Sequence, residues 1–189
     1  MNCGHFTHPK KEKVVAGTVL IFYFVIYSFG GFLLEVAFAA VTRNPKRDRK
    51  CFYLLPLCPV YGLGAVAILS LPTAVLDSPW LLFFGGGAAA TATEYLTGLF
   101  DEKVAGVAFW DYSHLPLNVG GKVCLLFSGV WGLLAVALVN LLHPAVSGIA
   151  AAIPPFLALP LLTLVLGDAL RSVCLLRRCG SADCLRWGR

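Results

Sequence analysis

Long apolar runs, separated by short polar segments, dominate the chain. Five of them are long enough to cross about 30 Å of hydrocarbon, which takes about 20 residues of α-helix. Their approximate bounds are 14–41, 54–76, 81–100, 123–142 and 154–176. The pattern predicts an all-α fold, a polytopic transmembrane helical bundle of about five spans.

The composition indicates a membrane protein with a single transmembrane domain. Hydrophobic residues make up 58% of the chain and charged residues 13%, and the mean hydropathy is +0.79. A soluble domain of this length exposes far more charge. We therefore expect one transmembrane domain at 14–176, between a short N-terminal tail at 1–13 and a basic C-terminal tail at 177–189. The lipid bilayer is its first partner. Nucleic acid is not an expected partner, because the basic residues cluster beside the apolar runs.

The distribution of Lys and Arg predicts an orientation in the membrane. Three of the 15 basic residues precede the first run, and the other twelve lie in the first and third loops and near the C-terminus. The positive-inside rule then places the N-terminus outside and the C-terminus in the cytoplasm. Ala37-Phe38-Ala39 also resembles a signal-peptide cleavage site. However, the apolar run is about twice as long as a usual signal, so cleavage is the weaker reading.

Proline and small residues refine the expected helices. Pro56 and Pro59 predict that the second run begins with a broken or re-entrant segment. The turn at 77–80 is short, so the helices on its two sides should be antiparallel neighbours. Small residues fill 85–93 and recur at Ser128, Gly129 and Gly132. Such residues let helix backbones approach closely and predict a central position for the third run.

Glu35 and Glu94 each interrupt an apolar run. An ionised carboxylate near the bilayer centre costs about 2.5–3.5 kcal/mol on insertion scales, so such residues normally face protein, water or a cation. Glu35 lies seven residues before Thr42, and Glu94 lies seven before Asp101. At 1.5 Å per residue, both carboxylates should lie about 10 Å inside the cytoplasmic end of their helices. They could bind a cation jointly, share a proton, or each be capped by a neighbour that only fixes the packing.

Further polar residues cluster on the predicted cytoplasmic side. We expect four of them to line a substrate-binding or ion-binding site with the two acids: Tyr61, Asp111, Asn118 and Lys122. Asp111 and Asn118 could instead cap helix starts, and Lys122 could bind a lipid phosphate. Trp110 and Tyr112 are interpreted as interfacial anchors.

Other candidate chemistry is weaker. Asp168 and Arg171 are three residues apart and could form an ion pair near the cytoplasmic end. The seven cysteines show no repeated pair spacing and predict neither a disulfide framework nor a metal site. No cofactor is expected. The chain has no GxxxxGK[ST] loop, so any ATP-driven role requires a separate ATPase subunit.

Three stretches together resemble a known family. They are YSFGGFLLEV at 27–36, LLPLCPVYGLGAV at 54–66 and the segment 93–132, which contains EYLTG, WDYS and WG. They are similar to the bacterial ABC-transporter permease group called type IV or CmpB-like. The resemblance implies a multi-pass plasma-membrane protein that is a transporter component. Two departures are Lys50-Cys51, where the family often has a basic residue followed by Gly, and Lys122, where it often has Arg. Lys cannot reproduce the bidentate grip of an Arg.

Three functions are consistent with these patterns. The leading hypothesis is a transport component, partnered by copies of itself or by other subunits, in which Glu35 and Glu94 bind substrate or a coupling ion. A second is a membrane enzyme acting on lipid or isoprenoid headgroups, with Asp111 or Glu94 as the acid or base and Lys122 holding phosphate. The third is a non-catalytic scaffold that docks another membrane protein through the small residues of 85–93.

Overall fold

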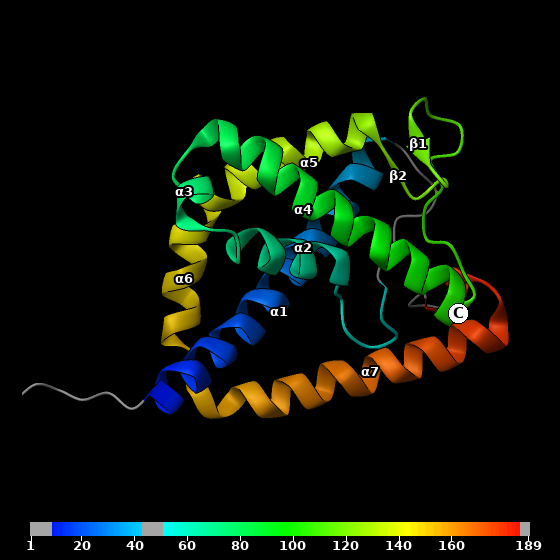
Figure 1. Cartoon of the computed structure of the whole chain (residues 1–189). Helices are drawn as coiled ribbons and strands as arrows, with labels where there is room; N and C mark the ends of the chain where they lie inside the picture. The colour runs from blue at the N-terminus through cyan, green and yellow to red at the C-terminus, as the bar shows by residue number, and fades with distance from the viewer. Residues whose placement is uncertain (1–8, 43–50, 186–189) are drawn as a thin grey trace, which may run out of the picture.

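A computed structural model of the chain describes residues 9–42 and 51–185, with side chains from Gly17 onward. Within these ranges the fold is a helical bundle, which confirms the predicted all-α class (Figure 1). The α-helices are α1 (Pro9–Val41), α2 (Pro59–Leu69), α3 (Thr73–Leu76), α4 (Pro79–Phe100), α5 (Leu125–Ala137), α6 (His143–Ala152) and α7 (Ala158–Cys179). Short elements connect them: the π-helices η1 (Asp101–Ala105) and η2 (Leu138–Leu142), the 3₁₀ turns η3 (Pro155–Leu157) and η4 (Ala182–Leu185), and a small antiparallel hairpin, β1 (Asn118–Val119) with β2 (Val123–Cys124).

Three helical runs among the described residues are long and apolar enough to cross a membrane. They are Gly17–Val41, Leu125–Ala152 and Pro155–Cys179. Helix α4 has 22 residues, and α2 is an apolar helix of only 11. The basic residues of 43–50 and 186–189, on which much of the predicted orientation depends, lie outside the described residues.

Proline determines where the second apolar run becomes helical. Residues 54–58 are not helical, Cys58 is extended, and α2 begins at Pro59, as the prolines predict. The helix ends at Leu69, and Pro72 then precedes α3. The expected run 54–76 is therefore an irregular entry followed by two helices. Helices α2 and α4 contact each other across the short turn, as expected for neighbours.

Small residues bring α4 and α5 into close contact, which confirms the predicted packing. A Cβ on Gly87 would lie 3.1 Å from the Cα of Gly132, and one on Gly86 would lie 2.6 Å from the Cβ of Ala135. The backbones can approach this closely only because glycine has no side chain. The small-residue face of α4 is thus used within the chain.

The fourth apolar run is longer than expected. Helix α5 continues through η2 into α6 as far as Ala152, ten residues beyond the predicted end at Leu142. In Figure 1 the run changes direction where α6 begins and descends along the left side. A π-helical turn followed by Pro144 accounts for the change, since both features bend helices.

Helix α7 ends in a disulfide that the cysteine spacing does not predict. Cys179 is bonded to Cys184 of η4. Five-residue steps do not keep one face of a helix, but α7 stops at Cys179. Gly180 then turns the chain back with a φ of +66°, a conformation that favours glycine. The turn brings the two cysteines together.

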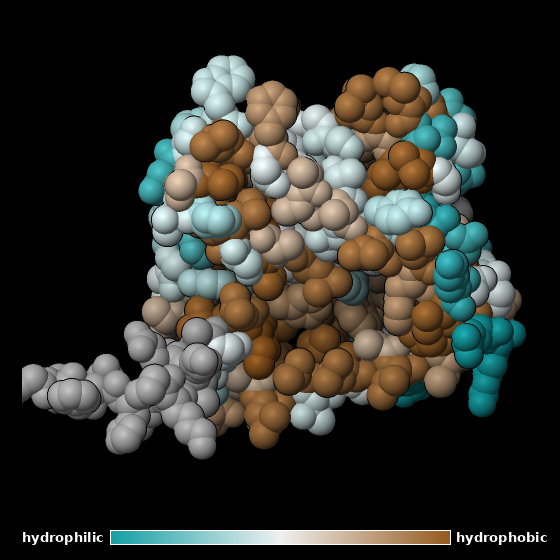
Figure 2. Space-filling view, viewed as in Figure 1, coloured by the Kyte–Doolittle hydropathy of each residue, from teal (hydrophilic) through white to brown (hydrophobic). Residues whose placement is uncertain are grey.

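The surface separates an apolar body from polar ends. Figure 2 shows hydrophobic side chains over the centre of this face and a hydrophilic edge at the right, near the carboxyl end of α7 and the hairpin. Exposed large apolar side chains on α7 include Leu159, Leu166 and Leu170. Such a surface suits lipid contact over the helices and water at their ends.

Candidate functional site

Glu94 is a buried carboxylate with two aromatic donors. It lies on α4, and 4% of its surface is exposed. The phenol of Tyr112 donates a hydrogen bond of 3.1 Å to Oε1, and the indole N–H of Trp131 donates one of 2.8 Å to Oε2. Both oxygens therefore have a partner, as a buried carboxylate requires.

Glu35 is held in a similar way from α2. The hydroxyl of Tyr61 donates a hydrogen bond of 2.8 Å to Oε1 of Glu35. Helices α1 and α2 approach closely at this level, because the ring of Tyr61 lies against Gly31, where any Cβ would clash with it. Gly31 is one helical turn before Glu35, so it leaves room for the ring that holds the carboxylate.

Two aromatic rings connect the carboxylates. The ring centroids of Tyr61 and Trp131 are 5.3 Å apart and the ring planes are inclined at 56°, which is within the range of favourable aromatic pairs. Since Tyr61 binds Glu35 and Trp131 binds Glu94, one continuous chain of contacts joins the two acids. We call Glu35, Tyr61, Trp131, Glu94 and Tyr112 the carboxylate network.

Tyr112 brings the loop after α4 into the network. Its ring stacks on Phe127 of α5 with centroids 4.7 Å apart, and its hydroxyl reaches Glu94. Burial and the charge of Glu94 raise the pKa of this phenol, so it stays a hydrogen-bond donor. Trp110 is also more than an anchor, because its indole N–H donates to the Lys122 carbonyl oxygen at 2.8 Å. The interfacial interpretation of these two aromatics misses their polar contacts.

Asp111 and Asn118 shape the loop that ends in the hairpin. Asp111 accepts hydrogen bonds from the backbone N–H and the hydroxyl of Ser113, and these bonds lower the pKa of its carboxyl. The Asn118 side chain donates to the Leu115 carbonyl oxygen at 2.8 Å and accepts from the Gly121 N–H at 3.1 Å. Both side chains are thus engaged with the loop itself.

Lys122 lines a pocket beside the network. Its Nζ lies 2.5 Å from Oε2 of Glu102, and the pKa of that exposed carboxyl is lowered by this contact. The pocket has a volume of about 240 Å³, and its lining includes Gly98, Asp101, Trp110, Asp111 and Lys122. Gly98 leaves room for the side chain of Lys122, because a Cβ at position 98 would lie only 3.3 Å from Lys122 Cγ.

Asp101 is a titratable residue of this pocket that is not among the predicted site residues. Burial raises its pKa to about 7, since a low-dielectric environment disfavours the charged carboxylate. Its position directly after the third apolar run is the signal that could have identified it. Of the six predicted site residues, the structure joins Glu35, Tyr61 and Glu94 in the network and places Asp111 and Lys122 at the pocket. Asn118 holds the adjoining loop.

Asp168 is buried like Glu94, and its partners differ from those expected. Only 3% of its surface is exposed. Its carboxylate accepts hydrogen bonds from the backbone N–H groups of Leu54 and Leu55, the latter at 2.7 Å, instead of pairing with Arg171. Arg171 lies over the ring of Tyr53, 4.3 Å from its centroid. The possible ion pair of Asp168 with Arg171 is therefore not formed, because the irregular segment supplies the backbone N–H groups of residues 54 and 55, from which the carboxylate accepts hydrogen bonds.

One protein-family model matches most of the chain. The family model described as "Putative ABC-transporter type IV" matches residues 22–173. The chain belongs to this family. The match includes α2, α4 and α5 entirely and every residue of the carboxylate network, and it agrees with the resemblance of the three sequence stretches. No curated protein and no solved structure matches the chain. Family and apolar helices together identify a membrane-embedded transporter component.

Proposed function

We propose that the chain forms the substrate-binding or ion-binding part of a transporter, with Glu35 and Glu94 as the binding carboxylates. One observation carries this proposal: the two acids belong to a single network of contacts that joins α1, α2, α4 and α5. Holding two carboxylates within an apolar bundle is costly. A site that attracts a cation is the use that explains both of them.

The chemistry of the network favours a cationic substrate or coupling ion. The groups bonded to Glu94 are a phenol and an indole, which are neutral donors. They stabilise the carboxylate without cancelling its charge, so a cation entering the site would gain electrostatic attraction. The Tyr61 and Trp131 rings could add cation–π attraction.

The pocket beside the loop serves as the proposed entrance. Asp111 and Lys122 line it, and Asn118 fixes the loop that forms its wall. Tyr112 connects this loop to Glu94, so a movement of the loop would change the hydrogen bond that Tyr112 donates to the carboxylate. We place the entrance on the cytoplasmic side of a bacterial plasma membrane, with the N-terminus outside and the C-terminus inside.

Partners complete the proposed transporter. The chain has no P-loop, so an ABC-type mechanism requires a separate ATPase subunit. A bundle of this size encloses little volume, which favours a translocation path at an interface between copies of the chain or with another membrane subunit.

Binding and transport measurements test the proposal. Purified protein is first screened for cations that raise its Tm, since a ligand that binds the folded state stabilises it. Each cation found is then tested for flux in reconstituted vesicles, with any co-purifying ATPase and ATP. Glu35→Gln and Glu94→Gln should each abolish the Tm increase and reduce flux at least tenfold. The matched control, Asp77→Asn on the exposed turn before α4, should leave both unchanged. Unchanged binding and flux in both glutamine variants would overturn the proposal.

The other two hypotheses have less support. An enzyme acting on headgroups would need Lys122 and either Asp111 or Glu94 available. Lys122 pairs with Glu102, Asp111 binds Ser113, and Glu94 accepts hydrogen bonds from Tyr112 and Trp131. A scaffold docking through the small residues of α4 would need that face exposed. Gly86 and Gly87 pack instead against α5.

A further inference from the structure

Two thiols face each other at the base of the irregular segment before α2. The Sγ atoms of Cys51 and Cys58 are 4.0 Å apart and form a hydrogen bond. The backbone supports this approach, because the Cys51 N–H donates to the carbonyl oxygen of Leu57 at 3.2 Å. The backbone therefore already holds Cys51 beside Leu57, the neighbour of Cys58. Only the distance between the two sulfur atoms has to shorten for a bond to form.

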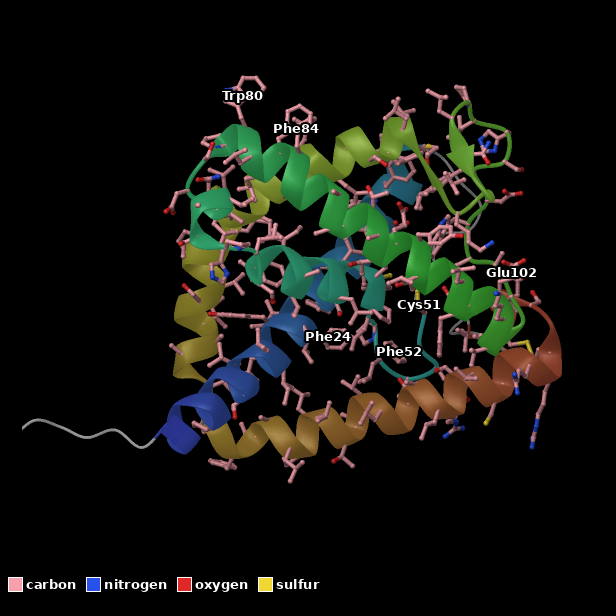
Figure 3. All side chains as sticks on the ribbon, in the orientation of Figure 1. Phe24, Cys51, Phe52, Trp80, Phe84 and Glu102 are labelled. Atoms are coloured by element: carbon pink, nitrogen blue, oxygen red, sulfur yellow. A yellow bond between two sulfur atoms is a disulfide. The ribbon has the colours of Figure 1, made fainter. Side chains whose placement is uncertain are left out.

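The two thiols differ in accessibility. Cys58 is 2% exposed, whereas Cys51 is partly exposed. In Figure 3, Cys51 lies inside the ring of helices seen in this view, whereas Trp80 and Phe84 project outward from α4. Because Cys51 is the more exposed of the two residues, we expect a small reagent to meet Cys51 before Cys58. An attack on the pair should therefore begin at Cys51.

The surroundings favour oxidation of the pair over binding of a metal ion. Across 9–42 and 51–185, no group of three His, Cys, Asp or Glu side chains is placed to hold a metal ion. The carboxylates of Glu35 and Asp101 lie near enough to Cys51 to disfavour a negative charge on its thiol. Two bound thiolates would add more negative charge to this poorly hydrated region, which is costly. A disulfide is neutral and avoids this cost. The sulfur atoms need to move together by about 2 Å to reach the bonding distance of about 2.05 Å.

We propose that Cys51 and Cys58 form an oxidation site, at which a small-molecule disulfide of the glutathione type converts the two thiols into an intrachain disulfide. The Cys51 thiolate attacks one sulfur of the oxidant, forming a mixed disulfide and releasing one thiolate. The Cys58 thiolate then attacks Cys51 Sγ and releases the second. The two released thiolates take up the two protons lost by the cysteines. The protein is oxidised by two electrons and the oxidant is reduced to two thiols.

The rate of this exchange should rise with pH. The hydrogen bond with Cys58, burial, and the negative charges of Glu35 and Asp101 raise the pKa of the Cys51 thiol well above its ordinary value. Since the thiolate is the nucleophile, a raised pKa makes the first attack slow near neutral pH. The rate should increase about tenfold per pH unit below that pKa, in proportion to the thiolate fraction.

Mass spectrometry tests the proposal on the full chain in lipid vesicles. The protein is incubated with oxidised glutathione, remaining thiols are blocked with a maleimide after denaturation, and the chain is cut with chymotrypsin. Phe52, Tyr53 and Leu54 lie between the two cysteines, so cleavage there leaves two peptides that only a disulfide can join. The expected result is a Cys51–Cys58 linked pair that dithiothreitol separates.

Single substitutions identify the order of the steps. Cys58→Ser should trap glutathione on Cys51, because the second thiol is missing, whereas Cys51→Ser should leave Cys58 without glutathione. Cys124→Ser, at another buried thiol, is the matched control and should leave the linked pair intact. Glutathione on the exposed Cys174 reports that the oxidant has acted. Maleimide on both Cys51 and Cys58 in wild-type chains that carry glutathione at Cys174 would overturn the proposal.

Discussion

The indole N–H of Trp131 donates a hydrogen bond of 2.8 Å to Oε2 of Glu94 and so joins α5 to α4 in the middle of the bundle. Glu94 is almost fully buried, and Tyr112 is its other hydrogen-bond donor. The cost of removing one donor from a buried charged group is set by the carboxylate oxygen left unpaired. This contact is therefore both an element of the candidate site and a source of stability.

Replacing Trp131 with Phe should destabilise the protein by about 1–3 kcal/mol, because the ring is largely kept while the donor to Glu94 is lost. Thermal unfolding in detergent, followed by far-ultraviolet circular dichroism, measures the change. Trp80→Phe is the control, since the Trp80 side chain is exposed and should tolerate the same change. Equal Tm values for the two variants would contradict a contribution of the Trp131–Glu94 bond to stability.

Replacing Asp168 with Ala should release the segment 53–55 from α7. The backbone N–H groups of Leu54 and Leu55, which are partly buried at these bonds, lose their acceptor, and the cost should be at most about 1–3 kcal/mol each, the value for fully buried donors. Hydrogen exchange should show faster exchange at these two amides. Thr163→Ala, on the exposed side of α7, serves as the control. Unaltered protection of Leu54 and Leu55 would show that Asp168 does not hold the segment.

Asp101 should make stability depend on pH. Its folded-state pKa of about 7 lies above the ordinary value of 3.8, so the folded state binds more protons than the unfolded state between these two values. Stability contributed by this residue therefore falls as pH rises from about 4 to about 7 and is constant above that. Asp101→Asn cannot ionise and should avoid this loss, which is at most about 4 kcal/mol at 1.36 kcal/mol per pKa unit.

Unfolding measurements from pH 5 to pH 8 check this expectation. The stability of the Asp101→Asn variant relative to wild type should increase across the range. Asp111→Asn is the matched control. The pKa of the Asp111 carboxyl is lowered rather than raised, so this variant should gain nothing at high pH. If the difference in stability between Asp101→Asn and the wild type stays constant with pH, Asp101 has an ordinary pKa in the folded protein.

Adding a methyl group at Gly132 should separate α4 from α5. A Cβ there would lie 2.7 Å from the Phe83 carbonyl oxygen and 2.9 Å from its ring, so the helices would have to move apart. We expect Gly132→Ala to cost about 1–3 kcal/mol, the usual effect of overpacking. Gly129→Ala, three residues earlier on α5, meets nothing within 4 Å and should have little effect. Thermal stability of the two variants, measured side by side, decides whether the close approach matters.

Spacing along the helices suggested that the two acids belong together but did not identify their neighbours. Counting residues places Glu35 and Glu94 at one level, and the structure brings both into one network. Periodicity does not reveal which way an isolated aromatic side chain faces, so Trp131 gave no signal as a partner of Glu94. Gly87 and Gly132 were predictable as close-packing positions, because glycine in an apolar helix has a specific physical use.

Features that depend on irregular backbone were not predictable from the sequence. Asp168 binds the N–H groups of 54 and 55, and nothing in the sequence places that segment beside α7. The disulfide of Cys179 and the thiol pair of Cys51 both require turns whose geometry the spacing of cysteines does not contain. The prolines indicated that the segment before α2 is irregular. They did not indicate which side chain would accept hydrogen bonds from its backbone N–H groups.

The hydrogen bonds from the segment 53–55 to Asp168 have a consequence for how the protein is assembled during translation. The donors emerge from the ribosome more than a hundred residues before their acceptor on α7. Until α7 is inserted, these amides depend on water or temporary partners, so the segment 53–55 cannot take its final position early. Helix α7 therefore completes the placement of the segment 53–55.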